Sequence, residues 1–387
     1  MASLFDYLAW RGDLRFSAAP FNPVDNILFS ILSYCLWEGI VGGIGGDDNE
    51  TRSTVTIGEA ATVLLGEIAE KRKRLNMTFI FKENLRHLLE VIRDAPRFAD
   101  TRLRAYVNHF DKKIEKQFSA ITFIPEAGDP YIAFRGTDDS IIGWKEDFNM
   151  VFSEAIPAQR EAVDYLEKAA RLFRGTFNTG GHSKGGNLAV YAATFCSKRV
   201  RKRIRNIYNN DGPGITGSIA ARPEYAEIMP RIITFIPQTS IVGLLFEHKD
   251  DYIVVESTEK GILQHNPFSW NVMRNDFRRL DSVTAESRSI NETLTHWLAG
   301  MDQKRRRHFI DALFAVFKET GVSSIDDLTA DRLKSAANII KAVQRYDKET
   351  KEMLFSTFAS LFDIVSNRFR SILKKSVKNA RLKLPLP

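Results

Sequence analysis

Short strand-like runs alternate with helical stretches over the middle of the chain, and this alternation restricts the fold more than any other feature. From about Phe118 six such runs follow one another: SAITFIP, PYIAFRG, TFNTGG, IRNIYNN, RIITFIP and YIVVES. Helical stretches such as AQREAVDYLEKAARLF and GGNLAVYAATFCSKRV separate several of them. Strands that alternate with helices form βαβ units, in which the strands run parallel. The sequence therefore predicts an α/β fold, with a mostly parallel sheet and helices on both faces.

The residues on either side of this middle part are predicted to be helical. Residues 1–110 form an expected N-terminal helical layer, because IGEAATVLLGEIAEKRKRL and KENLRHLLEVIRDA carry apolar residues at helical spacing. The apolar stretch 27–46 contains Glu38 and several glycines, which favours a buried core helix leading into a loop over a membrane span. Beyond about Asp281 helix follows helix. We expect one domain over residues 1–280, with its sheet in 111–280, and a helical extension over 281–387.

The excess of positive charge is confined to the end of the chain. Lys and Arg number 55 against 48 Asp and Glu, a net charge of +7. Residues 364–387 hold seven basic residues and no acid, so the rest of the chain is neutral and gives no indication of nucleic-acid binding. This segment continues an apolar stripe, a pattern typical of a helix lying on an anionic membrane surface. The alternative is a helix packed on the preceding domain and ending in a disordered tail.

Other sequence signals exclude several classes of protein. The two cysteines, Cys35 and Cys196, are too few for a disulfide framework or a cysteine-based zinc site. The first residues lack the basic and apolar segments of a secretory signal. Neither a phosphate-binding loop nor an H-E-x-x-H helix occurs. We expect a cytoplasmic protein without metal or organic cofactor, whose membrane contact, if any, is peripheral.

The sharpest motif is Gly181-His-Ser183-Lys-Gly185, directly after one predicted strand and directly before an apolar helix. A serine on a sharp strand-to-helix turn projects above the sheet, and glycines two residues to either side remove the Cβ atoms that would clash there. The first backbone N–H groups of the helix face the same site and can stabilise a developing negative charge. The motif indicates a nucleophilic serine. A plain turn is the alternative.

A second motif joins Phe134-Arg-Gly-Thr137 to Gly143-Trp144-Lys-Glu-Asp147. Together with GHSKGGN, NDGPG and QHNPFSW it gives the chain a resemblance to the class 3 (fungal-type) lipases. The chain resembles more closely a bacterial family of α/β-hydrolases called Mbeg-like, over most of residues 1–280. The resemblance implies an α/β-hydrolase fold and a serine hydrolase with an ester-type substrate.

The same resemblance implies roles for three further residues. The backbone N–H groups of Thr137 and Lys184 would form the oxyanion hole, and Asp147 would orient the Thr137 loop. From the residues alone, Trp144 is equally well explained as a packing tryptophan and Asp147 as a carboxylate at a helix start.

The catalytic base is expected after the last strands, because the chain order in such folds is serine, acid, histidine. Among the histidines beyond Ser183, we favour His265 over His248, His296 and His308. His265 follows YIVVES by a short loop, and Pro267 favours an irregular backbone there.

The acid is less clear from the sequence. In class 3 lipases it follows the strand equivalent to RIITFIP, but Ser240 and Ile241 occupy that place here. Asp211 ends the preceding strand and becomes the first candidate, with Asp250 and Asp251 as alternatives. Asp211 is also explained as a turn former in Asn-Asp-Gly-Pro.

These residues predict a Ser183–His265–Asp211 triad that hydrolyses a carboxylic ester, such as a lipid or phospholipid, through an acyl-enzyme. Cleavage of an amide or thioester would use the same triad. The alternative from another class is a catalytically silent hydrolase fold that serves as a membrane or protein adaptor.

Overall fold

The computed structural model describes most of the chain up to residue 288. The described residues are 2–44, 54–70, 82–111, 113–114, 116–137, 146, 150, 155–240, 242–244, 251–285, 287–288 and a few positions between 308 and 354. The chain divides into two units, Met1–Gly300 and Met301–Pro387. Every helix and strand given below belongs to the first unit. The basic segment 364–387 lies outside the described residues, as do Trp144, Asp147, Ile241, His248, Asp250 and His296.

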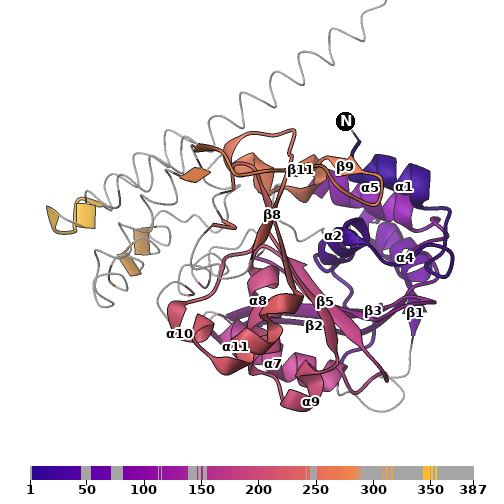
Figure 1. Cartoon of the computed structure of the whole chain (residues 1–387), viewed down its shortest axis with the longest axis horizontal. Helices are drawn as coiled ribbons and strands as arrows, with labels where there is room; N and C mark the ends of the chain where they lie inside the picture. The colour runs from indigo at the N-terminus through magenta and orange to yellow at the C-terminus, as the bar shows by residue number, and fades with distance from the viewer. Residues whose placement is uncertain are drawn as a thin grey trace, which may run out of the picture. The chain divides into compact units, whose positions relative to one another are not determined.

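A nine-stranded sheet forms the centre of the first unit, with the order β1-β2-β3-β4-β5-β6-β7-β8-β11 (Figure 1). Its strands are β1 (Val55–Thr56), β2 (Arg102–Asp111), β3 (Lys116–Ile124), β4 (Tyr131–Phe134), β5 (Phe177–His182), β6 (Ile204–Asn210), β7 (Ile232–Pro237), β8 (Tyr252–Val255) and β11 (Arg279–Leu280). The five strands β4 to β8 run parallel, and antiparallel strands continue the sheet on both sides. A separate antiparallel pair joins β9 (Val272–Met273) to β10 (Asp276–Phe277). The α/β fold class is thus confirmed, with the parallel part in the middle of a mixed sheet.

Helices cover both faces of this sheet. One face carries α1 (Leu4–Arg11), α2 (Pro23–Leu32), α4 (Ile57–Ala69) and α5 (Lys82–Ile92), and the other carries α7 (Pro157–Ala169), α8 (Lys184–Phe195) and α11 (Pro223–Ile228) (Figure 1). Two short helices, α9 (Lys198–Arg201) and α10 (Gly217–Ala220), and the 3₁₀ turns η1 (Met229–Arg231), η2 (Gly261–His265) and η3 (Pro267–Ser269) complete the connections.

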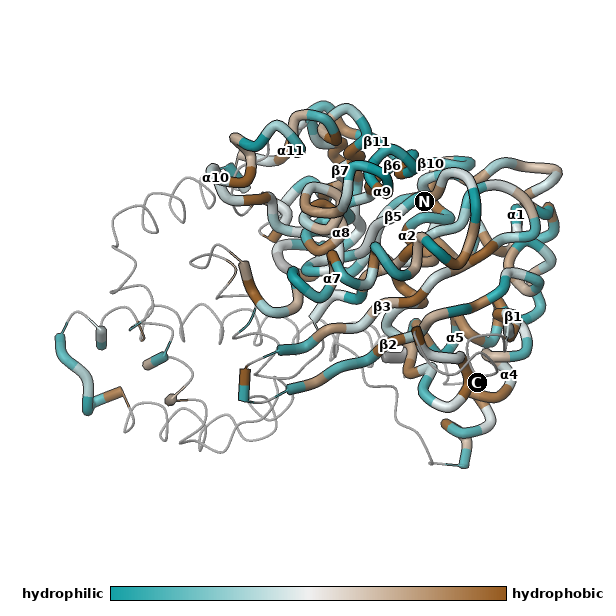
Figure 2. Tube along the Cα trace, turned by 90° about the horizontal axis from the view of Figure 1, so that it is seen from below, coloured by the Kyte–Doolittle hydropathy of each residue, from teal (hydrophilic) through white to brown (hydrophobic). Residues whose placement is uncertain are grey.

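Side chains of β4 pack into two hydrophobic clusters, one on each face of the sheet. Tyr131 and Ala133 join the cluster under the N-terminal helices, whereas Ile132 and Phe134 join the cluster under α7 and α8. Successive side chains of a strand point to opposite faces, so a strand covered on both sides reads as a continuous apolar run. Figure 2 shows hydrophobic stretches, in brown, interspersed with hydrophilic ones, in teal, along the strands and helices of this unit.

The helices α1, α2 and α4 begin at capping boxes that the sequence encodes. Ser3 with Asp6, Asn22 with Asp25, and Thr56 with Glu59 each satisfy the first amides of a helix reciprocally. Every residue of α2 from Val24 to Leu32 is buried, as expected of a core helix. None of the helices within the described part of the chain is long and apolar enough to cross a membrane.

Residues 1–110, which the sequence predicts to be mostly helical, also contain two strands. The strand β2 occupies Arg102–Asp111 and pairs antiparallel with β3, and the short β1 pairs with β2. A bulge lies between Arg104 and Val107, where Ala105 has a φ of 58°. An extra residue in a strand interrupts the alternation of apolar and polar side chains, so the period of two is hidden in the sequence.

Candidate functional site

Ser183 occupies the sharp turn between β5 and α8. Its φ of 59° and ψ of −133° lie in a region that side-chain-bearing residues rarely adopt. A Cβ atom added at Gly181 would lie 2.4 Å from the Phe134 carbonyl oxygen, and one at Gly185 would lie 2.1 Å from the same atom. Both glycines are therefore required for β4 to approach the turn, and the serine stands at the carboxyl end of a central strand.

Asp211 lies beside this turn on the neighbouring strand. His182 pairs with Asn210 across β5 and β6, and Ser183 N–H donates to the Asn210 carbonyl over 2.9 Å. Asp211 follows directly with a φ of 50°, which Asp tolerates better than most residues. The carboxyl ends of parallel strands meet at one edge of the sheet, so Ser183 and Asp211 lie at the same edge.

His265 reaches this edge from the loop after β8. Its Nδ1 lies 2.6 Å from the Asp211 Oδ2 atom, and the two side chains are 12% and 1% exposed. Because a carboxylate oxygen accepts, His265 Nδ1 carries the hydrogen, which leaves Nε2 as the nitrogen able to take a proton. The structure thus brings together two of the predicted site residues that are 54 positions apart in the sequence.

The second carboxylate oxygen of Asp211 is held by Ser240. Ser240 Oγ donates to Asp211 Oδ1 over 2.5 Å and accepts from the Gly243 N–H over 2.9 Å. A Cβ atom at Gly243 would lie 2.3 Å from Asp211 Oδ1, so a larger residue would displace the carboxylate. Ser240 stands where class 3 lipases are expected to carry their acid. The sequence shows that no acid stands at this position. It does not show that Ser240 binds Asp211, at the end of the preceding strand.

His182 also has a function that the sequence analysis missed. It is 1% exposed, and its ring lies 4.5 Å from that of His265 between centroids. Its Nε2 donates to the His265 carbonyl over 2.8 Å, and its Nδ1 lies 3.1 Å from the Tyr34 hydroxyl. Burial lowers the pKa of His182 well below its ordinary value, and the neighbouring His265 adds to this. His182 is therefore a neutral side chain that fixes the backbone of His265, and only its position next to Ser183 could have suggested this.

The two predicted oxyanion residues flank the serine turn. Thr137 is buried and is the third residue after β4. A Cβ atom at Gly136 would lie 2.6 Å from the His182 carbonyl oxygen, so the Thr137 loop runs close against the strand that ends at Ser183. Lys184 is the first residue of α8, where backbone N–H groups have no acceptor within the helix.

The Lys184 side chain makes a buried ion pair. Its Nζ lies 3.0 Å from Glu146 Oε2, and both side chains are 1% exposed. Nζ also donates to the Gln117 carbonyl, while Glu146 accepts from the backbone N–H groups of Gln117 and Ala158. Glu146 precedes Asp147, the residue expected to orient the Thr137 loop, which lies outside the described residues. Through these contacts Glu146 connects the segment between β4 and α7 to β3 and to the start of α8.

Of the alternative acids, Asp251 is exposed just before β8, and Asp250 lies outside the described residues. In the described part of the chain, no group of three or more side chains has the composition of a metal site.

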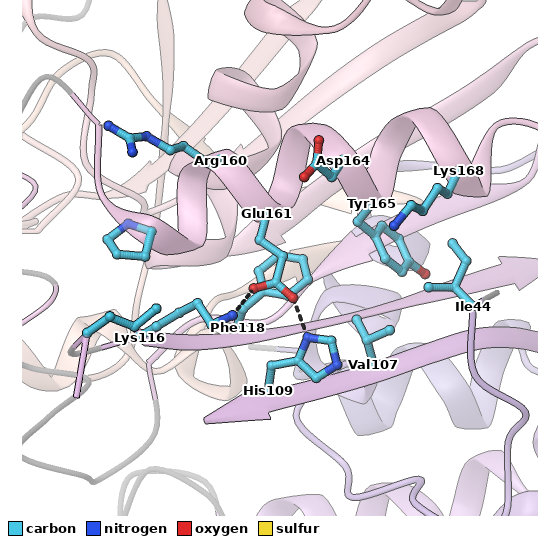
Figure 3. Close-up of a pocket in the computed structure, with 12 residues that line it drawn as sticks. Ile44, Val107, His109, Lys116, Phe118, Arg160, Glu161, Asp164, Tyr165 and Lys168 are labelled. Atoms are coloured by element: carbon cyan, nitrogen blue, oxygen red, sulfur yellow. Dashed lines mark hydrogen bonds and ion pairs between the residues drawn. The ribbon is translucent and has the colours of Figure 1, made fainter. Parts of the chain in front are cut away.

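A hollow of about 540 Å³ lies between α7 and the β2–β3 hairpin, next to Gln117 (Figure 3). Its floor is apolar and includes Val107, Phe118 and Tyr165. On its rim Glu161 forms ion pairs with both Lys116 and His109. The acid therefore compensates the charge of Lys116.

Among the solved structures that match this chain are two fungal lipases. A fungal lipase in an inhibitor complex, described as a model for interfacial activation, is 14% identical, with a TM-score of 0.33 over 52% of this chain and 81% of that one. The Rhizomucor miehei lipase–propeptide complex is 15% identical, with a TM-score of 0.29 over 44% of this chain and 66% of that one. A comparison with curated proteins found no match.

The family model named Mbeg1-like matches residues 92–315, which is more than half of the chain and includes Ser183, Asp211 and His265. The chain belongs to the Mbeg1-like family.

Proposed function

We propose that this protein is a serine hydrolase that cleaves a carboxylic ester through Ser183, His265 and Asp211. The observation that carries the proposal is the 2.6 Å contact between Asp211 Oδ2 and His265 Nδ1 at the sheet edge where Ser183 occupies its strained turn. A carboxylate bound to Nδ1 fixes the imidazole tautomer and stabilises the imidazolium that forms during attack.

In the proposed reaction, His265 Nε2 takes the hydroxyl proton of Ser183 while Ser183 Oγ bonds to the ester carbonyl carbon. The imidazolium then gives this proton to the alcohol oxygen as the carbon–oxygen bond of the ester breaks. The alcohol leaves and an acyl-enzyme remains. Water, deprotonated by the same nitrogen, attacks the acyl carbon, and the carboxylic acid is released as Ser183 regains its proton.

The negative charge of the tetrahedral intermediate would be stabilised by backbone N–H groups of Thr137 and Lys184. Their flanking positions support this, because Gly136 presses the Thr137 loop against His182 and Lys184 begins α8. The ion pair between Lys184 and Glu146 would hold the two sides of this oxyanion site together. Asp147 remains a candidate for orienting the Thr137 loop.

The proposed substrate is a lipid-like ester. The predicted amphipathic, basic segment 364–387 supports this choice, since it would bring the enzyme to an anionic membrane surface where such esters are found.

Fluorophosphonate labelling followed by intact-mass analysis tests the proposal. The probe should add once to the wild-type protein and not to Ser183→Ala, whereas the exposed Ser218→Ala is the matched control and should label normally. Proteins that the probe labels should also hydrolyse p-nitrophenyl esters of increasing acyl length, and Ser183→Ala should not. Absence of labelling in the folded wild-type protein would contradict the proposal and favour a catalytically silent adaptor.

A further inference from the structure

The run from Lys198 to Arg205 has six basic residues in eight positions, and its four arginines have different surroundings in the structure. Arg201 pairs with Glu227, Arg205 pairs with Asp129, and Arg203 donates to backbone carbonyls. These three side chains join elements of the fold. Arg199 remains exposed and lines a pocket that the proposed hydrolase reaction does not use.

This pocket has a volume of about 820 Å³ and lies between the end of α7, the turn before β5 and α9. Four arginines line it, Arg171, Arg174, Arg199 and Arg203, against a single acid, Glu167. Glu167 is already engaged, because its Oε1 accepts from the Ser197 N–H over 2.5 Å. Among the described residues, no acid forms an ion pair with any of the four arginines.

Arg203 is held in place by backbone carbonyls on one side of this pocket. Its three nitrogens donate to the carbonyls of Gly175, Ala170 and Phe173 over 2.6, 2.6 and 2.8 Å. Carbonyls satisfy its hydrogen bonds but do not neutralise its charge. Burial lowers the pKa of Arg203, and the nearby Arg199 lowers it further, as expected where like charges gather.

The hollow of Figure 3 provides a comparison. There Glu161 binds Lys116 and His109 directly, and Asp164 adds a second acid to the lining. The arginine pocket therefore has the larger excess of positive charge: four arginines face one acid there, whereas Lys116, Arg160 and Lys168 face two acids in the hollow of Figure 3.

We propose that the arginine pocket binds a phosphate group carrying two or more negative charges. Guanidinium groups present paired donors that match phosphate oxygens, and Arg203, which three carbonyls hold in place, loses little entropy when it binds. The pocket lies at the amino ends of β5 and β6, whereas Ser183 lies at the carboxyl end of β5. The length of α8, about 18 Å for twelve residues, separates the two sites. The phosphate site does not depend on the proposed hydrolysis.

Binding of inorganic pyrophosphate, followed by calorimetry on the full chain, tests the proposal for a free phosphate ligand. Co-sedimentation with phosphatidylcholine vesicles, with and without phosphatidic acid, tests a phospholipid head group as the source. The variant Arg171→Gln/Arg199→Gln removes two exposed side chains that make no described hydrogen bond. Arg160→Gln/Lys168→Gln removes the same charge from the hollow of Figure 3 and is the control.

We expect one of the two probes to bind the wild-type protein, and binding to weaken by about tenfold or more in the Arg171/Arg199 variant only. If the Arg171/Arg199 variant loses pyrophosphate binding, the ligand of the pocket is a soluble phosphate. If the variant loses only the binding that depends on phosphatidic acid, the ligand is a lipid head group. Failure of both probes, or an equal effect of both variants, would overturn the proposal. Thermal unfolding checks that the variants fold, and Arg199→Gln alone replaces the double variant should it unfold.

Discussion

Asp211 and Ser240 show how one carboxylate is held from two strands. Asp211 comes from the end of β6, and Ser240 from the segment after β7. Chain order and loop position made Asp211 and His265 candidates from the sequence, and the structure places their side chains in contact. The contacts of Ser240, His182 and Tyr34 could not be predicted, because they join residues 29 to 148 positions apart through the tertiary fold.

Asp211→Asn should reduce kcat on an activated ester by about 10⁴ while leaving the fold intact. Asparagine keeps the shape of the side chain and accepts a positive φ, but it no longer fixes the His265 tautomer. Steady-state kinetics measure the loss. Asp251→Asn is the matched control, and a collapse of activity in that variant with normal turnover by Asp211→Asn would mean that the acid has been misassigned.

His182 should make the protein less stable as the pH falls below about 6.5. Its pKa is lowered in the folded state, so below the ordinary value the unfolded chain binds a proton that the folded chain does not. Stability therefore rises with pH in this window, by at most about 1.4 kcal/mol per pH unit. Denaturant unfolding between pH 5 and 7.5 should show this slope in the wild type and a smaller one in His182→Gln. Identical slopes would show that the pKa of His182 does not differ between the folded and the unfolded protein.

At the scale of elements, the Lys184–Glu146 pair fastens three segments: the start of α8, the start of β3 and the segment between β4 and α7. Most strands and helices could be predicted because their apolar periodicity is uninterrupted. The strand β2 could not, since the bulge at Ala105 breaks its alternation. The buried ion pair could not be predicted either. Lys184 and Glu146 are 38 positions apart in the sequence, and no local pattern links them.

Removing one partner of this pair should destabilise the protein more than removing both. Glu146→Gln leaves a buried ammonium without its counter-charge, which costs about 3–5 kcal/mol, whereas Lys184→Met/Glu146→Gln removes both charges and should recover part of that loss. Chemical denaturation measures the free energy of unfolding of the two single variants and the double variant. Additive losses would show that the two side chains do not interact energetically.

Across the whole molecule, positive charge is concentrated at two places where anions could bind: residues 364–387 and the arginine pocket. Acidic and basic residues balance outside residues 364–387, so a general attraction to anionic surfaces must come from that segment. The arginine pocket is instead a local feature of the first unit and would recognise individual phosphate groups. The two contacts should therefore respond differently to truncation and to salt.

Deletion of residues 366–387 removes all seven basic residues of this segment and brings the formal net charge to zero. Each such residue near an anionic membrane contributes on the order of 1 kcal/mol, so the wild-type chain should co-sediment with phosphatidylserine vesicles at low salt and the truncated chain should not. Raising the ionic strength should release the wild-type chain, because exposed charges are screened within about 10 Å at 0.1 M salt. Ester hydrolysis in solution and pyrophosphate binding should be unchanged by the deletion, since neither site includes these residues. Vesicle binding that survives both the deletion and high salt would place the membrane contact elsewhere on the protein.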